Sequence, residues 1–143
     1  MKVVKAVKAL ITNGEGKILF MKEKTPSGRE YYGFPGGRLE GNETEEQALR
    51  REVREETGLG VSKASAVGGY SFVMENGTRV ECTVFECEVE NPESMRLDFQ
   101  DAAQEEITSF RWLSPEEFFS EKLPGASEGF SRFLQSLQTK RIL

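Results

Sequence analysis

Three glutamates near the end of one predicted helix have the spacing that points most clearly to chemistry. Glu52, Glu55 and Glu56 lie at positions i, i+3 and i+4, so a helix places their carboxylates on one face. They also precede Gly58, near the C-terminal end of the helix, where the helix dipole is negative. Each of these repulsions destabilises the helix by roughly a few tenths of a kcal/mol. We therefore predict a bound cation, and three carboxylates suit Mg²⁺ or Mn²⁺.

The composition excludes several other kinds of catalysis. The chain of 143 residues contains no histidine, which excludes Ser-His-Asp and Cys-His catalysis and removes the commonest zinc ligand. The chemistry must therefore rest on carboxylates, Lys, Tyr, Ser or Cys. The net charge of −5 argues against duplex nucleic acid as a partner. An anionic substrate still fits if metal ions neutralise it locally.

Length and hydropathy predict one globular domain over residues 1–143. Lys5 and Lys8 interrupt the apolar N-terminal run, and no segment reaches the length of a membrane span, so we expect a cytoplasmic protein with no membrane partner. Cys82 and Cys87 have opposite parity in one predicted strand. They should lie on opposite faces and be unable to form a disulfide with each other.

The helix that carries the glutamates has clear predicted ends. Thr44 and Gln47 have the spacing of a capping box, and Gly58 followed by Leu59 fits a glycine stop with its hydrophobic contact. The sequence 35–37, Pro-Gly-Gly, precedes the helix as a turn where backbone can approach a ligand closely.

Strand-like segments surround this helix on both sides. They are predicted at residues 3–12, 17–24, 31–35, 66–75, 78–89 and 107–113. The first two segments are predicted to pair as one hairpin, and Asn76-Gly77 is predicted to be the turn of a second.

Two further helices are predicted after the last strand. Ser114 and Pro115 open a short one, and the apolar spacing from Phe130 to Leu137 indicates a C-terminal amphipathic one. Residues 90–105 are polar and are predicted to form a surface loop. The order of strands, helix, strands and helix indicates an α/β (α+β) domain with a mixed sheet and helices packed on it.

Residues 37–59, GRLEGNETEEQALRREVREETGL, resemble the Nudix box, the signature of hydrolases that act on a nucleoside diphosphate linked to another group. The fixed positions of that pattern are Gly37, Glu43, Arg51, Glu52, Val53, Glu55, Glu56, Gly58 and Leu59. One neighbouring position departs from it, since Asn42 stands where a glycine is usual and is expected to adopt the same left-handed turn. The segments 33–36 and 112–114 also resemble the family. The resemblance implies an α/β/α sandwich with a mixed central sheet.

The resemblance also assigns roles to residues of the box. Glu52 and Glu56 are implied metal ligands, with the backbone carbonyl of Gly36 completing the site. Glu55 shares their face and is implied to be a third ligand or the base that activates water. Glu43 and Arg51 are implied to orient the loop and the helix, whereas Gly37 and Gly58 serve backbone geometry. Outside the box, the position of Glu106 relative to Trp112 resembles that of a further metal-binding or basic glutamate. The alternative for Glu106 is a solvated loop acid.

Candidate substrate contacts flank the box. Lys22, Arg29 and Arg38 could hold phosphate oxygens, although a lone lysine or arginine is more often a surface cation. A nucleobase could stack on one of several aromatic side chains, for which a place in the core is the alternative. These are Phe34, Tyr32, Tyr70 and Phe72.

The expected activity is metal-dependent hydrolysis of a pyrophosphate bond. Residues 74–77 carry neither the proline nor the tyrosine that marks some subfamilies, so the chain looks most like a MutT-type nucleoside triphosphate pyrophosphohydrolase that releases a monophosphate and pyrophosphate. ADP-ribose, nucleotide sugars and the 5′ end of RNA stay open as substrates. A nucleotide-sensing domain without turnover, and an isomerase on the same fold, are the other functions considered. The expected partners are a nucleotide-type small molecule and, as one option, a second copy of the chain in a homodimer.

Overall fold

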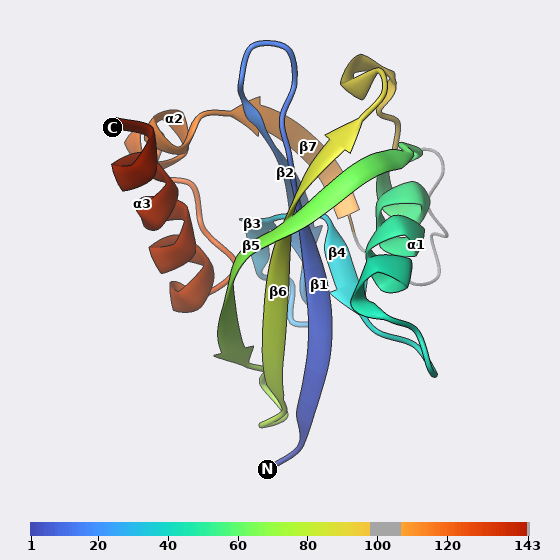
Figure 1. Ribbon diagram of the computed structural model, residues 1–143. Helices are drawn as coiled ribbons and strands as arrows, with labels where there is room; N and C mark the ends of the chain where they lie inside the picture. Colours follow the sequence, from blue (N-terminus) through green and yellow to red (C-terminus); the bar gives the residue numbers. More distant parts are fainter. Residues whose placement is uncertain (98–106, 143) are drawn as a thin grey trace.

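The computed structural model describes residues 1–97 and 107–142, with side chains through residue 138 (Figure 1). Its elements, in chain order, are β1 (Val3–Ile11), β2 (Ile18–Lys24), β3 (Glu30–Gly33), β4 (Gly36–Arg38), α1 (Glu45–Thr57), β5 (Val61–Val73), β6 (Arg79–Val89), the 3₁₀ turn η1 (Pro92–Ser94), β7 (Ile107–Leu113), α2 (Pro115–Ser120) and α3 (Glu128–Ile142). None of the described helices combines the length and the apolar character needed to cross a bilayer.

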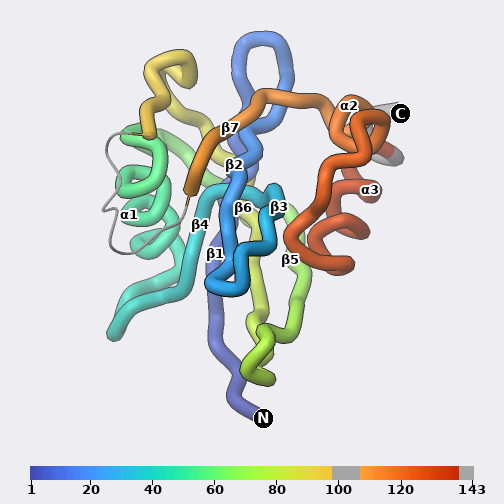
Figure 2. Tube along the Cα trace, turned by 180° about the vertical axis from the view of Figure 1, so that it is seen from behind, coloured from blue at the N-terminus to red at the C-terminus, as the bar shows by residue number. Residues whose placement is uncertain are grey.

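The strands form two sheets between the helices. One is a mixed sheet in the order β4-β1-β6-β5, in which β1 and β6 run parallel, and the other is antiparallel in the order β3-β2-β7. Helix α1 lies on one side of the strands, and α2 and α3 lie on the other, in both the front and the rear view (Figures 1 and 2). The predicted class, a mixed sheet with helices packed on it, is confirmed.

The predicted hairpin pairing of the first two strands is wrong. Within the described residues, one isolated bridge joins Thr12, just after the end of β1, to Ile18 at the start of β2. The ladder partners of β1 are β4 and β6, and those of β2 are β3 and β7. The parallel ladder between β1 and β6 continues from Val3 to Ile11, which gives β1 far more hydrogen bonds than a two-strand hairpin end could supply. Such a pairing joins distant segments and leaves no local turn signal.

Helix α1 has the ends that the sequence predicts. The Thr44 side chain accepts from the backbone N–H of Gln47 at 3.1 Å, and the Gln47 side chain accepts from the N–H of Thr44 at 2.9 Å. Gly58 has a left-handed conformation with φ of 76° and donates to the carbonyl of Arg54. The left-handed residue before the helix is Gly41 (φ 51°), whereas Asn42 is not among the residues with positive φ, so that prediction for Asn42 is wrong. The preceding glycine takes the strained position at lower steric cost.

Two clusters of buried side chains hold the layers together. Beneath α1, the aliphatic side chains of β1 pack against Leu49 and Val53. On the side of α2 and α3, the cluster is largely aromatic and includes Phe20, Phe118 and Phe130. Both clusters are closed by residues far apart in the chain.

The second half of the chain also follows most predictions. Strand β7 has the predicted bounds, Ser114 caps α2 with Pro115 in its first turn, and Gly77 lies in the turn of the β5–β6 hairpin. Strand β5 begins at Val61, earlier than predicted, because the serines and lysine at its start are exposed and carry no clear alternation. Cys82 and Cys87 are free thiols in different buried clusters, in agreement with the predicted parity. Half of the predicted 90–105 loop, residues 98–105, lies outside the described residues, and the described half contains η1 and the buried Met95.

Candidate active site

Two of the three predicted glutamates converge on the backbone of β4. Glu52 and Glu56 have exposed fractions of 7% and 2%, which is rare for carboxylates without dedicated partners. The backbone N–H of Gly36 donates to Oε1 of Glu56 at 2.8 Å. Because α1 ends just beyond Glu56, its last two turns face β4, as they do in Figure 2. The helix therefore brings both carboxylates to the same short stretch of extended backbone.

The glycines of β4 make this approach possible. A Cβ atom on Gly37 would lie 2.5 Å from Oε1 of Glu52, and one on Gly36 would lie 2.0 Å from the carbonyl oxygen of Val7. Gly36 also has a φ of 151°, which side chains other than hydrogen rarely allow. Residue 36 must therefore be glycine, because its Cβ would meet backbone, whereas a Cβ at residue 37 would displace the Glu52 carboxylate from its place against the strand.

Arg51 connects the helix to the loop before it. Its guanidinium binds both carboxylate oxygens of Glu43, at 2.7 and 2.9 Å, and donates to the Arg38 carbonyl at 3.1 Å. It also donates to Glu52 at 2.9 Å and to Glu55 at 3.3 Å. Arg51 thus holds the loop, the helix and two of the three glutamates in one network, which fits the orienting role implied for Arg51 and Glu43.

The hydrogen bonds of Arg51 lower the pKa of the neighbouring glutamates, whereas burial raises it. The hydrogen bond from Arg51, followed by that from the Glu40 N–H, lowers the pKa of Glu43 to about 2. Burial raises the pKa of Glu52 above its ordinary value, and Arg51 offsets only part of this rise. The same carboxylates raise the pKa of Arg51, so its guanidinium is charged whenever the protein is folded. A buried carboxylate that is disfavoured as an anion is a suitable partner for a cation.

The donor set fits a divalent ion in chemistry, although not as a preformed cage. Within the described residues, no group of three or more His, Cys, Asp or Glu side chains is already arranged around an ion position. Glu52 and Glu56 are buried side by side, but half of the Glu55 side chain is exposed and its carboxylate faces Arg51. Two hard oxygen ligands are therefore in place beside the Gly36 backbone, and Glu55 would join them by a side-chain rotation.

A comparison with known protein families decides the relationship. The sequence matches the family model for the NUDIX domain over residues 2–137. The chain belongs to the Nudix family. The resemblance seen in the sequence is thereby confirmed.

Relatives and solved structures of the Nudix family extend this result. The chain is 37% identical over 59 residues to an RNA pyrophosphohydrolase of Halorhodospira halophila. The matched segment covers 41% of this chain and 31% of that protein. It is 41% identical over 61 residues to an ADP-ribose pyrophosphatase of Methanocaldococcus jannaschii. The matched segment covers 43% of this chain and 36% of that protein. These matches span about a third of each relative. The MutT protein from Methanosarcina mazei Go1 has the same fold, with a TM-score of 0.80 at 22% identity over 98% of this chain and 96% of that one.

The predicted cations around the Nudix box occupy separate surroundings. Lys22 forms an ion pair with Glu30 at 3.3 Å. The Arg29 guanidinium lies 5.5 Å from the centre of the Tyr31 ring and reaches two carbonyls of the loop before α3. Arg38 is exposed on β4, and its backbone carbonyl accepts a hydrogen bond from Arg51 at 3.1 Å. Its guanidinium, however, donates to the sulfur of Met74 at 2.6 Å, on the face that Arg38 shares with Ala6 and away from the glutamates.

The predicted aromatic contact Phe34 lies in the core. Its side chain is 1% exposed, and its ring centre lies 4.9 Å from that of Phe130 and 5.8 Å from that of Phe20. A base has no access to either face of this ring, so Phe34 supports the fold around the Nudix helix. Glu106, together with Glu105, falls outside the described residues, and its predicted role stays a prediction.

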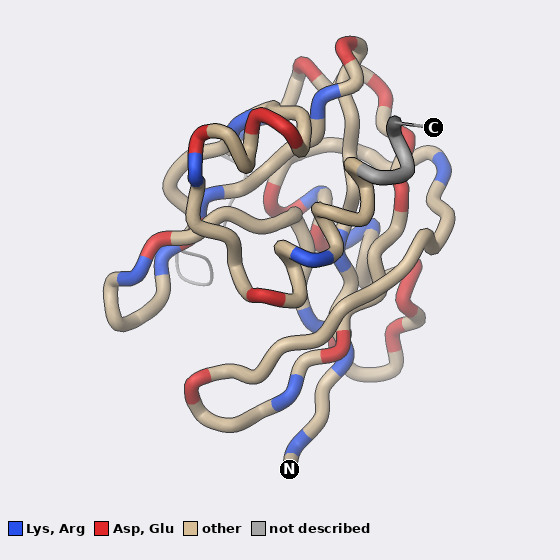
Figure 3. The backbone as a smooth tube through the Cα atoms, turned by 90° about the vertical axis from the view of Figure 1, so that its left-hand side faces the viewer, with Lys and Arg blue, Asp and Glu red and all other residues tan. Residues whose placement is uncertain are grey.

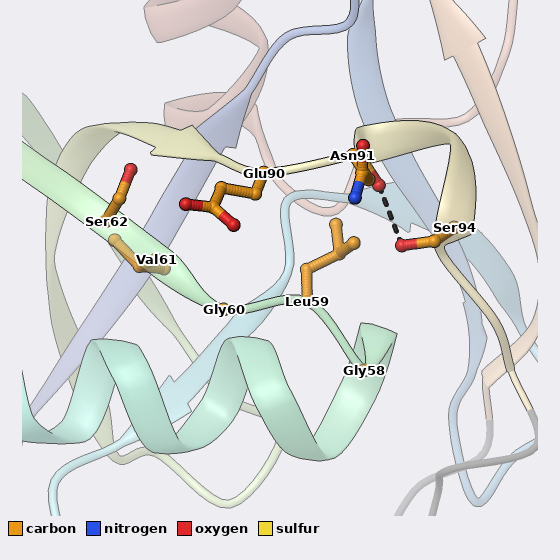
Figure 4. A pocket seen from close by; sticks show the side chains of 8 residues that line it. All are labelled: Gly58, Leu59, Gly60, Val61, Ser62, Glu90, Asn91 and Ser94. Carbon is orange, nitrogen blue, oxygen red and sulfur yellow. Dashed lines mark hydrogen bonds between the residues drawn. The ribbon is translucent and has the colours of Figure 1, made fainter.

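Two hollows in the surface lie away from the buried glutamates. One, of about 370 Å³, lies beyond the C-terminal end of α1, between Leu59 and Asn91 (Figure 4). The other, of about 310 Å³, lies across β5 and β6 between Tyr70 and Arg79. Charged residues of both signs are interspersed along the chain (Figure 3). The chemistry of the carboxylates, rather than the size of a hollow, therefore identifies the site.

The sequence analysis missed two charged residues of the inner strands. Lys8 and Glu23 are half-buried, and each influences the pKa of the other. Their alternation with buried neighbours was the signal that could have revealed Lys8, since β1 is apolar on both sides of it. Glu23 gave no such signal, because β2 ends in the charged residues Lys22, Glu23 and Lys24.

Proposed function

We propose that the protein is a divalent-metal-dependent hydrolase of the pyrophosphate bond in a nucleoside diphosphate-linked substrate. Within that class we propose a nucleoside triphosphate pyrophosphohydrolase that releases a monophosphate and pyrophosphate. The observation that carries the proposal is the burial of Glu52 and Glu56 against the Gly36–Gly37 backbone in a Nudix domain.

In this proposal Glu52, Glu56 and the Gly36 carbonyl hold Mg²⁺ or Mn²⁺. The ion would neutralise phosphate charge and lower the pKa of bound water. Glu55 is the residue best placed to accept a proton from that water, because its carboxylate is half exposed and is restrained by Arg51. Arg51 and Glu43 keep the helix and the loop in register and do not touch the substrate.

The choice of a triphosphate rests on the absence of other subfamily markers. The β5–β6 turn carries Met74, Glu75, Asn76 and Gly77, so neither the proline nor the tyrosine marker is present. ADP-ribose is the second candidate, because one relative with 41% identity over 61 residues is named as an ADP-ribose pyrophosphatase. Nucleotide sugars and the 5′ end of RNA follow on the same chemistry.

Product release across a nucleotide panel tests the proposal. Phosphate and pyrophosphate would be measured with nucleoside triphosphates, ADP-ribose, nucleotide sugars and dinucleoside polyphosphates, each with Mg²⁺, Mn²⁺ or EDTA. Pyrophosphate release from a triphosphate that EDTA abolishes would support the proposal. Cleavage confined to ADP-ribose or sugar nucleotides would keep the chemistry and overturn the substrate, whereas no release from any compound would overturn both.

The Glu56→Gln variant tests the site itself. Its amide oxygen can still accept from the Gly36 N–H, so the fold should be retained while the charge is lost. We expect kcat to fall by about 10²-fold or more, with an unchanged unfolding transition. The control Glu46→Gln removes an exposed carboxylate from the first turn of the same helix and should keep wild-type turnover. Normal kcat in Glu56→Gln would remove this site from the mechanism.

A further inference from the structure

Thr57, the last residue of α1, has a buried hydroxyl beside the two buried glutamates. The residue is 0% exposed, although threonine is usually found nearer the surface. Residues four apart in a helix are neighbours on its surface, so Thr57 follows Val53 in one row. Glu56 follows Glu52 in the adjacent row. Since Val53 packs in the cluster beneath α1, the Thr57 side chain points to the sheet next to the carboxylates.

The hydroxyl of Thr57 closes the end of the helix. It donates to the carbonyl of Val53 at 2.6 Å and accepts from the backbone N–H of Leu59 at 3.1 Å. One hydroxyl can make both bonds, because it carries a donor and two acceptor lone pairs. Leu59 is buried, so its N–H would be left without an acceptor if the hydroxyl were absent, which is unfavourable. The hydroxyl therefore fixes the last turn and the chain that leaves it.

Glu56 depends on this turn more than Glu52 does. Helix ends fray first, and Glu56 directly precedes Thr57, whereas Glu52 lies about one turn farther into the helix. Glu52 is also bound by Arg51 at 2.9 Å. Opening of the last turn would therefore displace Glu56 from the Gly36 N–H before it displaces Glu52. A shift of a fraction of an ångström in a ligand is enough to weaken a metal site.

The backbone of Thr57 connects the helix to the segment that follows β6. The N–H of Arg96 donates to the Thr57 carbonyl at 3.0 Å, and the neighbouring Met95 is buried in the cluster beneath α1. Farther out, the hollow of about 370 Å³ lies between the end of α1 and the residues Asn91 and Ser94 (Figure 4). The segment is therefore fastened to the helix at residues 95 and 96, where it meets Thr57.

We propose that Thr57 is a positioning residue for the metal ligand Glu56, and that it couples metal binding to the order of residues 92–97. The inference rests on the proposed function, because it takes Glu56 as a ligand of the divalent ion. A last turn in which Glu56 is held by an ion opens less often, and the same turn carries the acceptor of the Arg96 N–H. The coupling is reciprocal, so loosening the segment also weakens ion binding.

The affinity for Mn²⁺, measured from the electron paramagnetic resonance signal of the free ion, tests the positioning role without turnover. Valine and threonine are both branched at Cβ, so Thr57→Val keeps the buried position filled and removes the hydroxyl. We expect Mn²⁺ to bind about tenfold more weakly to this variant. Thr57→Ser retains the hydroxyl and should bind within about threefold of the wild type.

Thr83→Val is the matched control at the other end of the helix. The Thr83 hydroxyl donates to Oε2 of Glu45 at 2.6 Å, so the same replacement removes a hydrogen bond to the first turn of α1. Its Mn²⁺ affinity should equal that of the wild type. Thermal unfolding of each variant shows whether it is folded at the temperature of the titration. A folded Thr57→Val with wild-type Mn²⁺ affinity would give Thr57 a purely structural role and overturn the inference.

Amide hydrogen exchange of the wild type tests the coupling and needs no variant. Protection would be followed by nuclear magnetic resonance with and without Mg²⁺. The Leu59 and Arg96 amides donate to Thr57, and Mg²⁺ should raise their protection by about threefold or more. The amide of Gln47, which donates to the Thr44 side chain at the start of α1, should change less. An equal change at all three amides, or no change at Arg96, would overturn the coupling.

The inference and the proposed function fail in distinguishable ways. Equal Mn²⁺ affinity in the wild type and in folded Thr57→Val would overturn only the inference. Mn²⁺ binding that depends on Thr57, with no hydrolysis of any nucleotide, would overturn only the enzymatic function. An absence of Mn²⁺ binding by the wild type would overturn both.

Discussion

The two sides of the central strands are built from different chemistry. On the side of α1, Arg51 and three glutamates surround a backbone that has no side chains at Gly36 and Gly37. On the side of α3, aromatic rings pack against one another with centre-to-centre distances from 4.8 to 6.3 Å. They belong to Phe20, Phe34, Phe118, Phe130, Phe133, Tyr32, Tyr70 and Phe119.

The difference separates stability from chemistry. Burial of Glu52 raises its pKa, which means that the fold disfavours the anion that a metal site requires. Aromatic burial contributes stability without any such opposing term. We infer that the α3 side supplies much of the free energy that allows charged groups to be buried on the α1 side. Substitutions on the two sides should therefore act on different observables.

The largest expected effect is on the aromatic side. Phe130 is fully buried and contacts four other rings, so Phe130→Ala should lower the free energy of unfolding by about 3–5 kcal/mol. The melting temperature should fall by about 10 °C or more. Phe119→Ala, which removes a half-buried ring at the margin of the cluster, should have a smaller effect. Below its melting temperature, Phe130→Ala should keep the metal dependence of the wild type. Loss of turnover in the folded variant would show that the two sides are coupled.

The second largest effect is expected on the charged side, at Gly37. A Cβ atom added there would clash with the flexible end of the Glu52 side chain rather than with backbone. The Cβ of Gly37→Ala would displace the Glu52 carboxylate, which is 2.5 Å from that position, by rotating its flexible end. We expect turnover to fall by about 10²-fold with only a small change in melting temperature. Gly14→Ala is the control, since a Cβ there has no neighbour within 4 Å. Wild-type turnover in Gly37→Ala would mean that the resting position of Glu52 is not the one used in catalysis.

Both regions could be recognised in the sequence, but to different depths. The i, i+3, i+4 glutamates, the capping box and the glycine stop are local patterns, so α1 and its acidic face follow from sequence spacing alone. The parallel pairing of β1 with β6 joins distant segments, and the sequence contains no local signal for it. Phe34 was one of four aromatic residues considered as a base contact, with a place in the core as the alternative. The sequence did not decide between the two, because the depth of Phe34 depends on α3, which comes from the other end of the chain.

A third prediction separates the structural acid from the buried ones through pH. The pKa of Glu43 is lowered to about 2, first by the hydrogen bond from Arg51. An acid with a lower pKa in the folded state than its unfolded value of about 4.3 stabilises the fold above that value, and it loses this contribution as the pH falls toward 2. Glu43→Gln should therefore be less stable than the wild type near neutral pH.

Urea unfolding at about pH 7, 4, 3 and 2 measures this difference. The gap between the wild type and Glu43→Gln should close across the acid range. Glu46→Gln, which changes an exposed residue of the same helix, should follow the wild-type profile. A gap that stays constant down to the lowest pH would show that Glu43 acts through packing rather than through its charge.

The smallest expected effect is on stability, at the N-terminal caps of α1 on one side of the strands and of α2 on the other. Thr44 caps α1 and Ser114 caps α2, each within a capping box. Thr44→Ala and Ser114→Ala should each lower the free energy of unfolding by about 1 kcal/mol, whereas Thr44→Ser should not. Turnover should stay near that of the wild type in all three variants, because Glu52 and Glu56 are fixed by the β4 backbone and by Arg51 rather than by the first turn. If Thr44→Ala loses as much turnover as Gly37→Ala, the position of the glutamates is determined by the whole helix, and the chemistry cannot be assigned to its last turns alone.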